Sequence, residues 1–433
     1  MTDLKGLPTN LSRILEGIQR EELVQLALDL GNINSPPGKE GEVANYVEDW
    51  LKRHHFQTRR LALIKERPNV VGLLKGEGGG CCLIMNSHMD TSVSTEDRWI
   101  FRRPDNPIYF QAWRDGEKLY GNGVVNDKGP MAAFMLAAKA IEQSGAKMKG
   151  DLILTMVPGE IGWEPVDEFT APRFLSKEAG SRFLVTHGVT GDFALVAEAT
   201  NFRIAWLEAG KAFFKVTVYG DHPIYTPYIP RPKPMEKNPN AIVRMAKLIE
   251  LIEEWALDYE KKNRYECPGG TLIPKVNIGG IRGGSPYFVL QTAELCSVYL
   301  DVRLSPKQDP LTVRQEIEGL CKKLGLEAEV ELFLYRRGYE AQHIGPLADA
   351  IEKAHVQMFG AKPEPVVGPE CSMWRDTNVF NEMGIPSATY GPAAGAGGGN
   401  YFLTIDDLWV SAKLYALVML DICNREKSVR GDR

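Results

Sequence analysis

The order of the apolar segments along this 433-residue chain is the feature that most restricts its fold. Up to about residue 206, short apolar runs at 69–74, 82–85, 151–157 and 192–196 predict strands. Segments with helical spacing precede these strands, over 10–30 and through Val43, Val47 and Leu51, and another begins at Asp127, between the second and the third strand. This alternation predicts an α/β domain in which helices cover both faces of one sheet.

The pattern changes between residues 207 and 337. Predicted strands at 211–219, 271–281, 294–304 and 327–335 are accompanied by predicted helices at 240–255 and 310–324. The order β-α-β-β-α-β is typical of a small antiparallel sheet with two helices. From Gly345 the alternation of helix and strand resumes, ending in a helix over 405–423. We therefore expect an α/β domain of residues 1–206 and 338–433, interrupted by an inserted α+β domain of residues 207–337.

Charge and composition exclude several classes of function. The net charge is −5 and no dense block of Lys and Arg occurs, which argues against nucleic acid as a partner. No long apolar run predicts a membrane span, and the N-terminus lacks a basic-then-apolar leader. The seven cysteines are scattered without a CxxC pair, so neither a thiolate zinc site nor a disulfide framework is expected. These features favour a cytoplasmic protein.

Four residues with metal-binding chemistry fall at predicted strand ends or at a strand-to-helix turn: His88, Asp127, Glu160 and Glu198. In open α/β sheets, ligands bind at the carboxyl ends of the strands. An imidazole with carboxylates suits Zn²⁺, or Mn²⁺ where oxygen ligands dominate, with Co²⁺ as a further candidate. The order of the four residues therefore predicts a metal site at this edge of the sheet.

Asp90 follows His88 at a spacing that puts both side chains on the same side of an extended segment. Its carboxylate could then accept the second ring N–H of His88 and fix the tautomer. Each element alone also has an ordinary structural explanation, since an H-x-D segment can be a capped turn and an Asp before a helix can be its N-cap. The joint occurrence of these residues is more specific than any one of them.

The sequence resembles the family of acetylornithine deacetylase, succinyl-diaminopimelate desuccinylase and glutamate carboxypeptidase. Five segments carry the resemblance: NSHMDT at 86–91, LYGNGVVNDKGPMAA at 119–133, PGEIG at 158–162, ALVAEAT at 194–200 and GIPSATYGP at 384–392. The resemblance covers nearly the whole chain. It implies a zinc-exopeptidase-like catalytic domain, with a mixed sheet between helices, and an inserted domain that serves as a lid and as the dimerisation surface of a homodimer.

The resemblance also implies roles for individual residues. His88 matches a metal ligand, Asp90 the residue that supports it, and Asp127 the carboxylate that bridges two metals. Glu160 matches a ligand of the first metal and Glu198 a ligand of the second metal.

Two residues depart from the family pattern. The family has Glu-Glu before Ile-Gly, and the first Glu is the general base, whereas Gly159 stands here. Gly397 falls roughly where the family has a ligand His of the first metal. His88, Asp127 and Glu198 remain, and three protein ligands with an open position suffice to activate water at a single metal. Glu160 is then either a ligand of a second, weaker metal or the general base beside a single metal.

Four further residues are candidates for binding substrate. Phe288 stands where the family has an Asn, and it could favour a flat substrate part or fill the core of the lid. His222 is the nearest equivalent of a His that reaches the partner's active site, although its spacing differs. Arg375 precedes Asp376 near the last strand; Arg375 could bind a substrate carboxylate, since Arg binds carboxylates bidentately, or form a structural ion pair of the Arg375–Asp376 type.

We therefore expect a metal-dependent hydrolase that cleaves a C–N bond in a small, carboxylate-bearing substrate by means of a metal-activated water. By resemblance, the ordinary substrate is an N-acyl amino acid or a dipeptide. The departures leave two alternatives. One is an aromatic aminohydrolase of the nitroanthranilate type. The other is a catalytically inactive homologue that binds metal.

Overall fold

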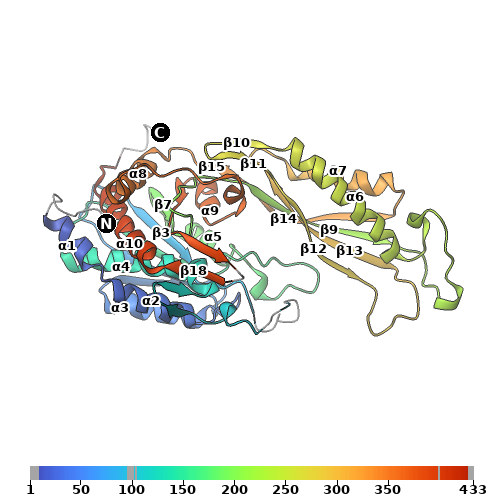
Figure 1. Cartoon of the computed structure of the whole chain (residues 1–433), viewed down its shortest axis with the longest axis horizontal. Helices are drawn as coiled ribbons and strands as arrows, with labels where there is room; N and C mark the ends of the chain where they lie inside the picture. Colours follow the sequence, from blue (N-terminus) through green and yellow to red (C-terminus); the bar gives the residue numbers. More distant parts are fainter. Residues whose placement is uncertain (1–8, 95–101, 103–104, 398–399, 428–433) are drawn as a thin grey trace. The chain divides into compact units, whose positions relative to one another are not determined.

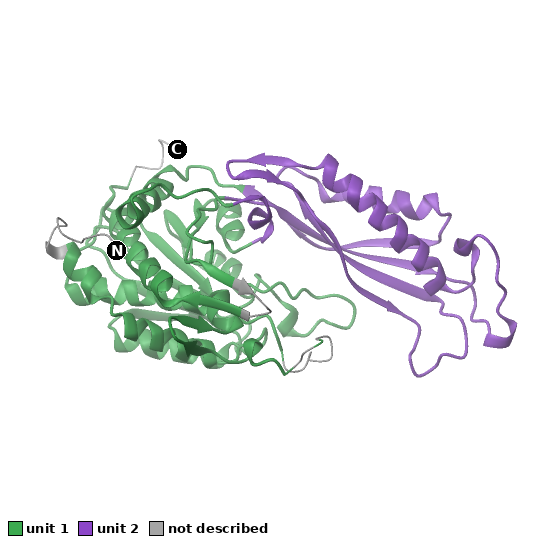
Figure 2. Cartoon of the chain, in the orientation of Figure 1, with its two compact units in different colours: residues 1–206, 340–366, 375–433 green, residues 207–339, 367–374 purple. Residues whose placement is uncertain are grey.

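The computed structural model describes residues 9–94, 102, 105–397 and 400–427. The chain forms two compact units, shown in different colours in Figure 2. Unit 1 comprises residues 1–206, 340–366 and 375–433, and unit 2 comprises residues 207–339 and 367–374. Unit 2 thus includes the short segment 367–374, which the apolar pattern had assigned to the catalytic domain.

A mixed six-stranded sheet lies at the centre of unit 1 (Figure 1). Its strands, in spatial order, are β1 (Gln57–Leu61), β2 (Asn69–Leu74), β6 (Leu152–Val157), β3 (Leu83–His88), β7 (Phe193–Val196) and β16 (Ser387–Thr389). The strands from β6 to β16 run parallel, while β1 and β2 pair antiparallel. The predicted α/β class with a mixed sheet is confirmed.

Apolar residues bury both faces of this sheet, because successive side chains of a strand point to opposite faces. Leu83 and Met85 of β3 join the larger core, while Ile84 joins a smaller core on the other face. The larger core contains residues of α1 (Thr9–Gly17), α2 (Arg20–Asn32), α3 (Gly41–Arg53), α4 (Gly129–Ser144), α8 (Gly345–Phe359) and α10 (Ile405–Asn424). The smaller clusters contain residues of α5 (Ser181–Thr186) and α9 (Thr377–Glu382).

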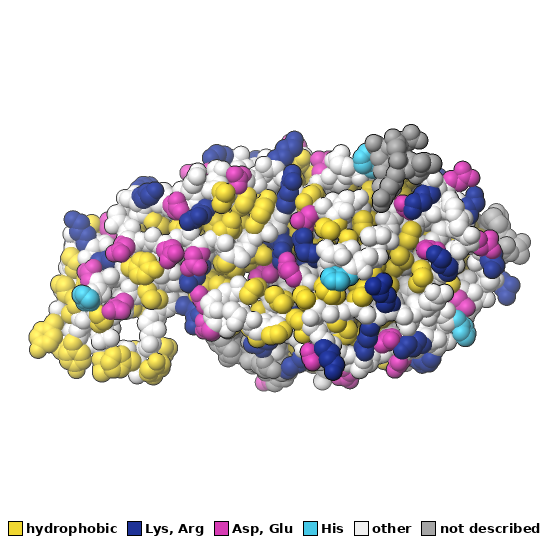
Figure 3. Space-filling view, turned by 180° about the vertical axis from the view of Figure 1, so that it is seen from behind, with side chains coloured by type: hydrophobic (Ala, Val, Ile, Leu, Met, Phe, Trp, Pro, Cys, Tyr) yellow, Lys and Arg dark blue, Asp and Glu magenta, His cyan; other side chains and the backbone are white. Residues whose placement is uncertain are grey.

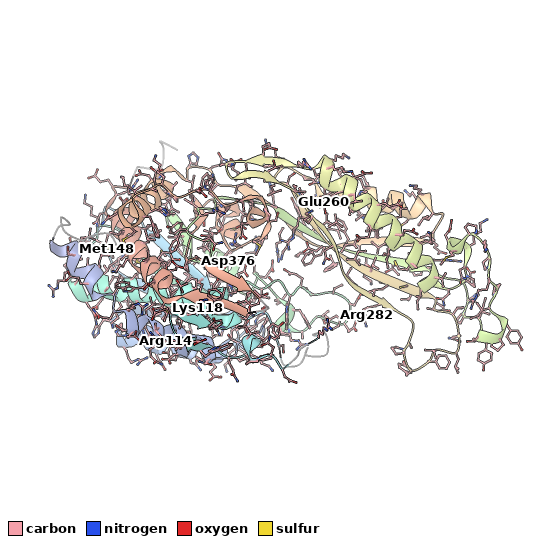
Figure 4. All side chains as sticks on the ribbon, viewed as in Figure 1. Arg114, Lys118, Met148, Glu260, Arg282 and Asp376 are labelled. Carbon is pink, nitrogen blue, oxygen red and sulfur yellow. The ribbon has the colours of Figure 1, made fainter. Side chains whose placement is uncertain are left out.

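Two features of unit 1 differ from the sequence prediction. The segment 10–30 forms two helices, α1 and α2, rather than one, with Gln19 in extended conformation between them. A second, four-stranded sheet was not predicted. Its order is β17 (Ala394–Gly397), β18 (Asn400–Thr404), β5 (Lys118–Tyr120) and β4 (Trp113–Asp115), and Figure 4 labels Arg114 and Lys118 in the β4–β5 hairpin.

Unit 2 has the predicted α+β character. Its antiparallel sheet has the order β12 (Val276–Gly283), β13 (Leu295–Leu304), β9 (Gly210–Tyr219) and β14 (Ala328–Arg336). Helices α6 (Ala241–Lys262) and α7 (Pro310–Lys323) share one apolar core with these strands. The predicted strand at 271–281 is divided into β11 (Gly270–Leu272), which pairs with β10 (Tyr265–Cys267), and β12. The short strands β8 (Leu207–Glu208) and β15 (Tyr339–Glu340) lie at the ends of the insertion.

Two loops of unit 2 expose large apolar side chains. One precedes α6 and carries Tyr225, Tyr228 and Met235; the other joins β12 to β13 and carries the four consecutive residues 287–290, of which Tyr287 is 92% exposed. Figure 3 shows hydrophobic side chains gathered at its left-hand end. No helix within the described parts of the chain combines the length and apolar character that crossing a membrane requires.

Candidate metal centre

The parallel strands of unit 1 bring the predicted ligands to one edge of the sheet. His88 ends β3, Glu160 follows β6 and Glu198 follows β7. Since β6, β3 and β7 are parallel neighbours, their carboxyl ends meet at the same edge. Asp127 lies in an irregular turn, Val124–Lys128, directly before α4.

His88 is buried, and its ring contacts acidic residues on both sides. Nε2 lies 3.2 Å from Oδ2 of Asp127, 3.0 Å from Oδ1 of Asn126 and 3.9 Å from Oε2 of Glu160. Nδ1 lies 2.9 Å from the backbone oxygen of Asp90 and 3.5 Å from its carboxylate Oδ1. The imidazole is therefore oriented so that Nε2 faces Asp127 and Glu160.

Asp90 links the His88 strand to the Glu160 turn. Its Oδ1 accepts a hydrogen bond from the backbone N–H of Glu160 (3.1 Å), and its Oδ2 accepts one from Ile161 (2.8 Å). Burial alone would raise the pKa of Asp90, but the hydrogen bond and charge of His88 hold this pKa below its ordinary value. Asp90 is thus a carboxylate that holds both His88 and the Glu160 turn in place.

Glu160 pairs with a cation that the sequence did not indicate. Nζ of Lys177 lies 2.7 Å from Oε1 of Glu160 and 3.1 Å from Oδ1 of Asp376, and Oγ of Ser181 donates to the same Asp376 oxygen (2.8 Å). Burial opposes ionisation of both groups, yet the charge of Lys177 lowers the pKa of Glu160, and the two carboxylates raise the pKa of Lys177. Glu160 and Lys177 form a buried, charged pair.

Glu198 is held by the other buried cation of the site. Nε of Arg375 lies 2.6 Å from Oε2 of Glu198, and Arg375 is only 3% exposed. The structural ion pair weighed for Arg375 therefore involves Glu198. Burial, followed by the charge of Asp127, raises the pKa of Glu198 well above its ordinary value despite Arg375. Burial also raises the pKa of Asp127, with a further contribution from the charge of Glu160.

The donor set fits one divalent cation. Oδ2 of Asp127 and Oε1 of Glu198 are both buried; Oδ2 lies 3.2 Å from Nε2 of His88 without good hydrogen-bond geometry, and Oε1 makes no hydrogen bond. Two buried carboxyls whose pKa values are raised by burial and mutual repulsion would be stabilised as carboxylates by a divalent cation beside the imidazole of His88. Among the described residues, no three His, Cys, Asp or Glu side chains are already gathered closely enough to hold a metal ion. Nε of Arg375 contacts Glu198, and Oδ1 of Asn126 contacts Nε2 of His88.

The backbone explains the absence of an acid at position 159. Gly159 has a φ of +74°, a conformation that L-residues adopt at a cost, and a Cβ there would overlap the carbonyl oxygen of Ser176. Oγ of Ser176 in turn donates to the carbonyl of Gly159 (3.0 Å). The segment that delivers Lys177 therefore fills the space that a side chain at 159 would need.

The remaining predicted residues lie in different places. Gly397 ends β17 and pairs with Asn400 in a hairpin, and glycine offers no side-chain ligand. Asp376, labelled in Figure 4, precedes α9 and is 1% exposed. Phe288 and His222 lie in loops of unit 2, and both are exposed. At 48% exposure, Phe288 does not fill the core of unit 2.

Sequence reasoning missed Lys177 and Asn126. Asn126 could have been suggested by its position next to Asp127. Lys177 lies 17 positions after Glu160, in a segment without a recognisable pattern, so no local signal marked it.

An imidazole and three carboxylates at the carboxyl edge of a mixed α/β sheet are the donor types and the location expected of a metal-dependent hydrolase centre. A family model described as peptidase family M20/M25/M40 matches residues 84–421. The chain belongs to this family.

Two curated relatives illustrate its range. N-formyl-4-amino-5-aminomethyl-2-methylpyrimidine deformylase of Bacillus subtilis is 25% identical over 449 aligned positions, which cover 94% of this chain and 96% of the relative. A probable succinyl-diaminopimelate desuccinylase of Staphylococcus aureus is 24% identical over 203 positions, which cover 46% of this chain and 44% of the relative.

Solved structures share the fold at low identity. A tripeptidase of Staphylococcus aureus has a TM-score of 0.69 at 17% identity, covering 94% of this chain and 99% of the other. Human carnosine dipeptidase 1 has a TM-score of 0.66 at 16% identity, covering 96% and 99%. A dinuclear metal-binding peptidase of Bacillus subtilis has a TM-score of 0.60 at 15% identity, covering 93% and 98%. The family membership and these relatives identify the chain as a metal-dependent hydrolase of C–N bonds, as the sequence analysis predicted.

Proposed function

We propose that this hydrolase works with one divalent metal ion, Zn²⁺ or Mn²⁺, held by His88, Asp127 and Glu198, and that Glu160 is its general base. The observation that carries the proposal is the pair of buried oxygens that make no hydrogen bond, Oδ2 of Asp127 and Oε1 of Glu198, in a cluster that includes His88. A bound divalent metal supplies Lewis-acid activation of water and of the scissile carbonyl.

The side chains around the metal position the ligands and transfer the proton. Asp90 holds His88 and the Glu160 turn in register through the contacts described above. Lys177 takes Oε1 of Glu160, while Oε2 lies on the side of His88, 3.9 Å from Nε2. Glu160 is ionised and retains 14% side-chain exposure, so it can accept a proton from the attacking water and deliver it to the leaving nitrogen. The ion pair with Lys177 and the remaining exposure of Glu160 favour its role as general base over its role as metal ligand.

The substrate that we propose is a small N-acyl compound bearing a carboxylate, such as an N-acyl amino acid or a dipeptide. Support comes from the relatives, which include a deformylase of an N-formyl amine and a desuccinylase. We retain Arg375 as the proposed contact of the substrate carboxylate because Arg binds carboxylates bidentately, although its side chain is 3% exposed and its Nε contacts Glu198. Asp376 is almost inaccessible and pairs with Lys177, so we assign it to the support of Lys177 rather than to substrate contact.

For unit 2 we propose the role of lid and dimerisation domain. Strands β12 and β14 are the outer strands of its sheet, and unpaired strand edges can pair with another chain. Exposed Tyr228 and Tyr287 add apolar surface on the neighbouring loops. Phe288 and His222 are accessible, as residues that contact substrate or partner must be. Light scattering coupled to size exclusion should give the mass of a dimer; a monomer at micromolar concentration would refute this assignment.

A cytoplasmic location is the last part of the proposal. All seven cysteines lie in the described part of the chain and none forms a disulfide. Unpaired cysteines are usual in a reducing compartment. Fractionation of the native cells, with detection by antibody, tests this assignment.

One experiment tests the proposed function itself. The protein is purified without chelator, its metal content is measured, and hydrolysis is assayed with N-acyl amino acids, dipeptides, N-formyl amines and aminobenzoates. We expect bound metal and turnover of an N-acyl substrate that is lost with EDTA and regained with Zn²⁺ or Mn²⁺. Release of ammonia from aminobenzoates alone would instead identify an aminohydrolase, and bound metal without turnover of any substrate would identify an inactive homologue.

A further inference from the structure

Lys177 places a permanent positive charge inside the carboxylate cluster. Its side chain is 1% exposed, and Nζ contacts three oxygens: Oε1 of Glu160 at 2.7 Å, the backbone oxygen of Glu160 at 3.1 Å and Oδ1 of Asp376 at 3.1 Å. A buried ammonium is tolerated only when it is paired and hydrogen-bonded, and three oxygen contacts satisfy its three N–H donors. Lys177 is therefore fixed in this position by the chemistry of its surroundings.

Lys177 engages Oε1 of Glu160, one of the two carboxylate oxygens that a metal ion near Glu160 could use, while Oε2 lies on the side of His88. A metal bound to Oε1 of Glu160 would face the ammonium at close range and be repelled by it. The resemblance to the family predicts a His ligand where Gly397 stands, and glycine supplies none. Asp127 and Glu198, by contrast, present oxygens without a hydrogen bond on the other side of the cluster. The ammonium of Lys177 therefore serves as the cation beside Glu160, whereas the oxygens of Asp127 and Glu198 could hold a divalent cation.

The backbone links the position of Lys177 to the absence of an acidic side chain at position 159. Between Glu160 and Lys177 the chain makes a loop, and Nη1 of Arg67 holds it through the carbonyls of Pro172 (2.8 Å) and Leu175 (2.5 Å). Ser176 then packs against Gly159 where a Cβ would lie. A side chain at 159 and the present course of the backbone at Ser176, directly before Lys177, thus exclude each other sterically.

We propose that Lys177 fills, as a covalently attached cation, the place of the first metal of a dinuclear centre, and so restricts this centre to a single divalent ion. The proposal rests on the proposed function, because it assumes that His88, Asp127 and Glu198 bind a metal. Beyond the proposed function, it states that Lys177, which is not a metal ligand, sets the number of metal ions that the centre binds.

The test measures metal stoichiometry rather than activity. Wild type, Lys177→Met, Lys177→Arg and the control Arg182→Met are dialysed against Mn²⁺, and bound metal is counted by mass spectrometry. The side chain of Arg182 forms ion pairs with Glu178 and Glu382 rather than with the carboxylates of the cluster. We expect one ion per chain in wild type, Lys177→Arg and Arg182→Met, and two in Lys177→Met, with an exchange-coupled Mn²⁺ pair in its electron paramagnetic resonance spectrum.

Removal of the ammonium leaves Glu160 and Asp376 unpaired and could prevent folding. The double variant Lys177→Met/Asp376→Asn reduces this repulsion, and circular dichroism checks that it folds; it is expected to bind two ions as well. A folded Lys177→Met or double variant that still binds one ion overturns the inference and leaves the proposed function intact. Two ions in the wild type also overturn the inference. Absence of metal and turnover from the wild type refutes the proposed function itself.

Discussion

Replacement of Gly159 by Ala or Glu should destabilise unit 1 without creating a general base. A left-handed conformation costs a non-glycine residue about 1–2 kcal/mol, of which about 0.4–1 kcal/mol is regained because Ala restricts the unfolded chain. At Gly159 the new Cβ also overlaps the carbonyl oxygen of Ser176 and lies 3.3 Å from Nη2 of Arg67. Overpacking of this kind costs about 1–3 kcal/mol. We expect Gly159→Ala to lower the free energy of unfolding by about 1–5 kcal/mol, once the regained part is subtracted from these costs.

Gly188 provides the matched control. It lies in the same unit with a φ of +88°, and a Cβ there would have no neighbour within 4 Å. Gly188→Ala therefore incurs the backbone cost alone, about 1 kcal/mol. Urea unfolding, monitored by hydrogen exchange of unit 1 peptides, measures the loss of unfolding free energy in Gly159→Ala and in Gly188→Ala. Equal destabilisation by the two Ala variants, or higher turnover in Gly159→Glu, would refute the view that Ser176 occupies the space that a base at position 159 would need.

Three further predictions concern the metal ligands and their neighbours. In the metal-free chain, burial lowers the pKa of His88, but the carboxylates of Asp127 and Asp90 outweigh it and raise this pKa well above its ordinary value of about 6.5. The stability that His88 contributes is therefore complete below pH 6.5 and is lost as the pH rises through the folded pKa. The melting temperature in EDTA should fall with rising pH and added Zn²⁺ should reverse this trend, whereas a melting temperature independent of pH would contradict the assignment. Asp90→Asn should weaken metal affinity about 10- to 100-fold, as measured by competition with a chelator, because both His88 and the Glu160 turn lose an orienting carboxylate; unchanged affinity would remove Asp90 from the site. If Arg375 binds the substrate, Arg375→Met should raise KM for a carboxylate substrate and leave KM for its amide analogue unchanged, while an equal effect on both would assign Arg375 to Glu198 alone.

Much of the fold was predictable because the apolar periodicities of strands and helices differ. Strands β2, β6 and β7 are found within one residue of their predicted ends. The break between α1 and α2 at Gln19 was missed, because the apolar spacing continues through Leu15, Ile18 and Leu23 on both sides of it. The hairpin β17–β18 was missed as well, because its glycines carry no apolar alternation; its strands are specified by pairing with the distant β5.

The site was predictable only where chemistry coincides with a strand end. His88 and Glu198 satisfy that condition, and the structure gathers them at one edge of the sheet. Lys177 does not, because its place is set by the loop that Arg67 holds and by partners as distant in sequence as Asp376. A buried cation in a loop has no sequence periodicity that predicts it, so the pairing of charges in the centre can be determined only from the three-dimensional structure.

The most direct test of the central claim is a crystal structure of the Zn²⁺-loaded protein with anomalous data collected at the zinc edge. We expect one anomalous peak within about 2.0–2.2 Å of Nε2 of His88 and of carboxylate oxygens of Asp127 and Glu198, with Lys177 still bound to Glu160. Two peaks, with Glu160 coordinating one of them, would contradict the single-metal centre. The absence of any peak at His88 would contradict the ligand assignment altogether.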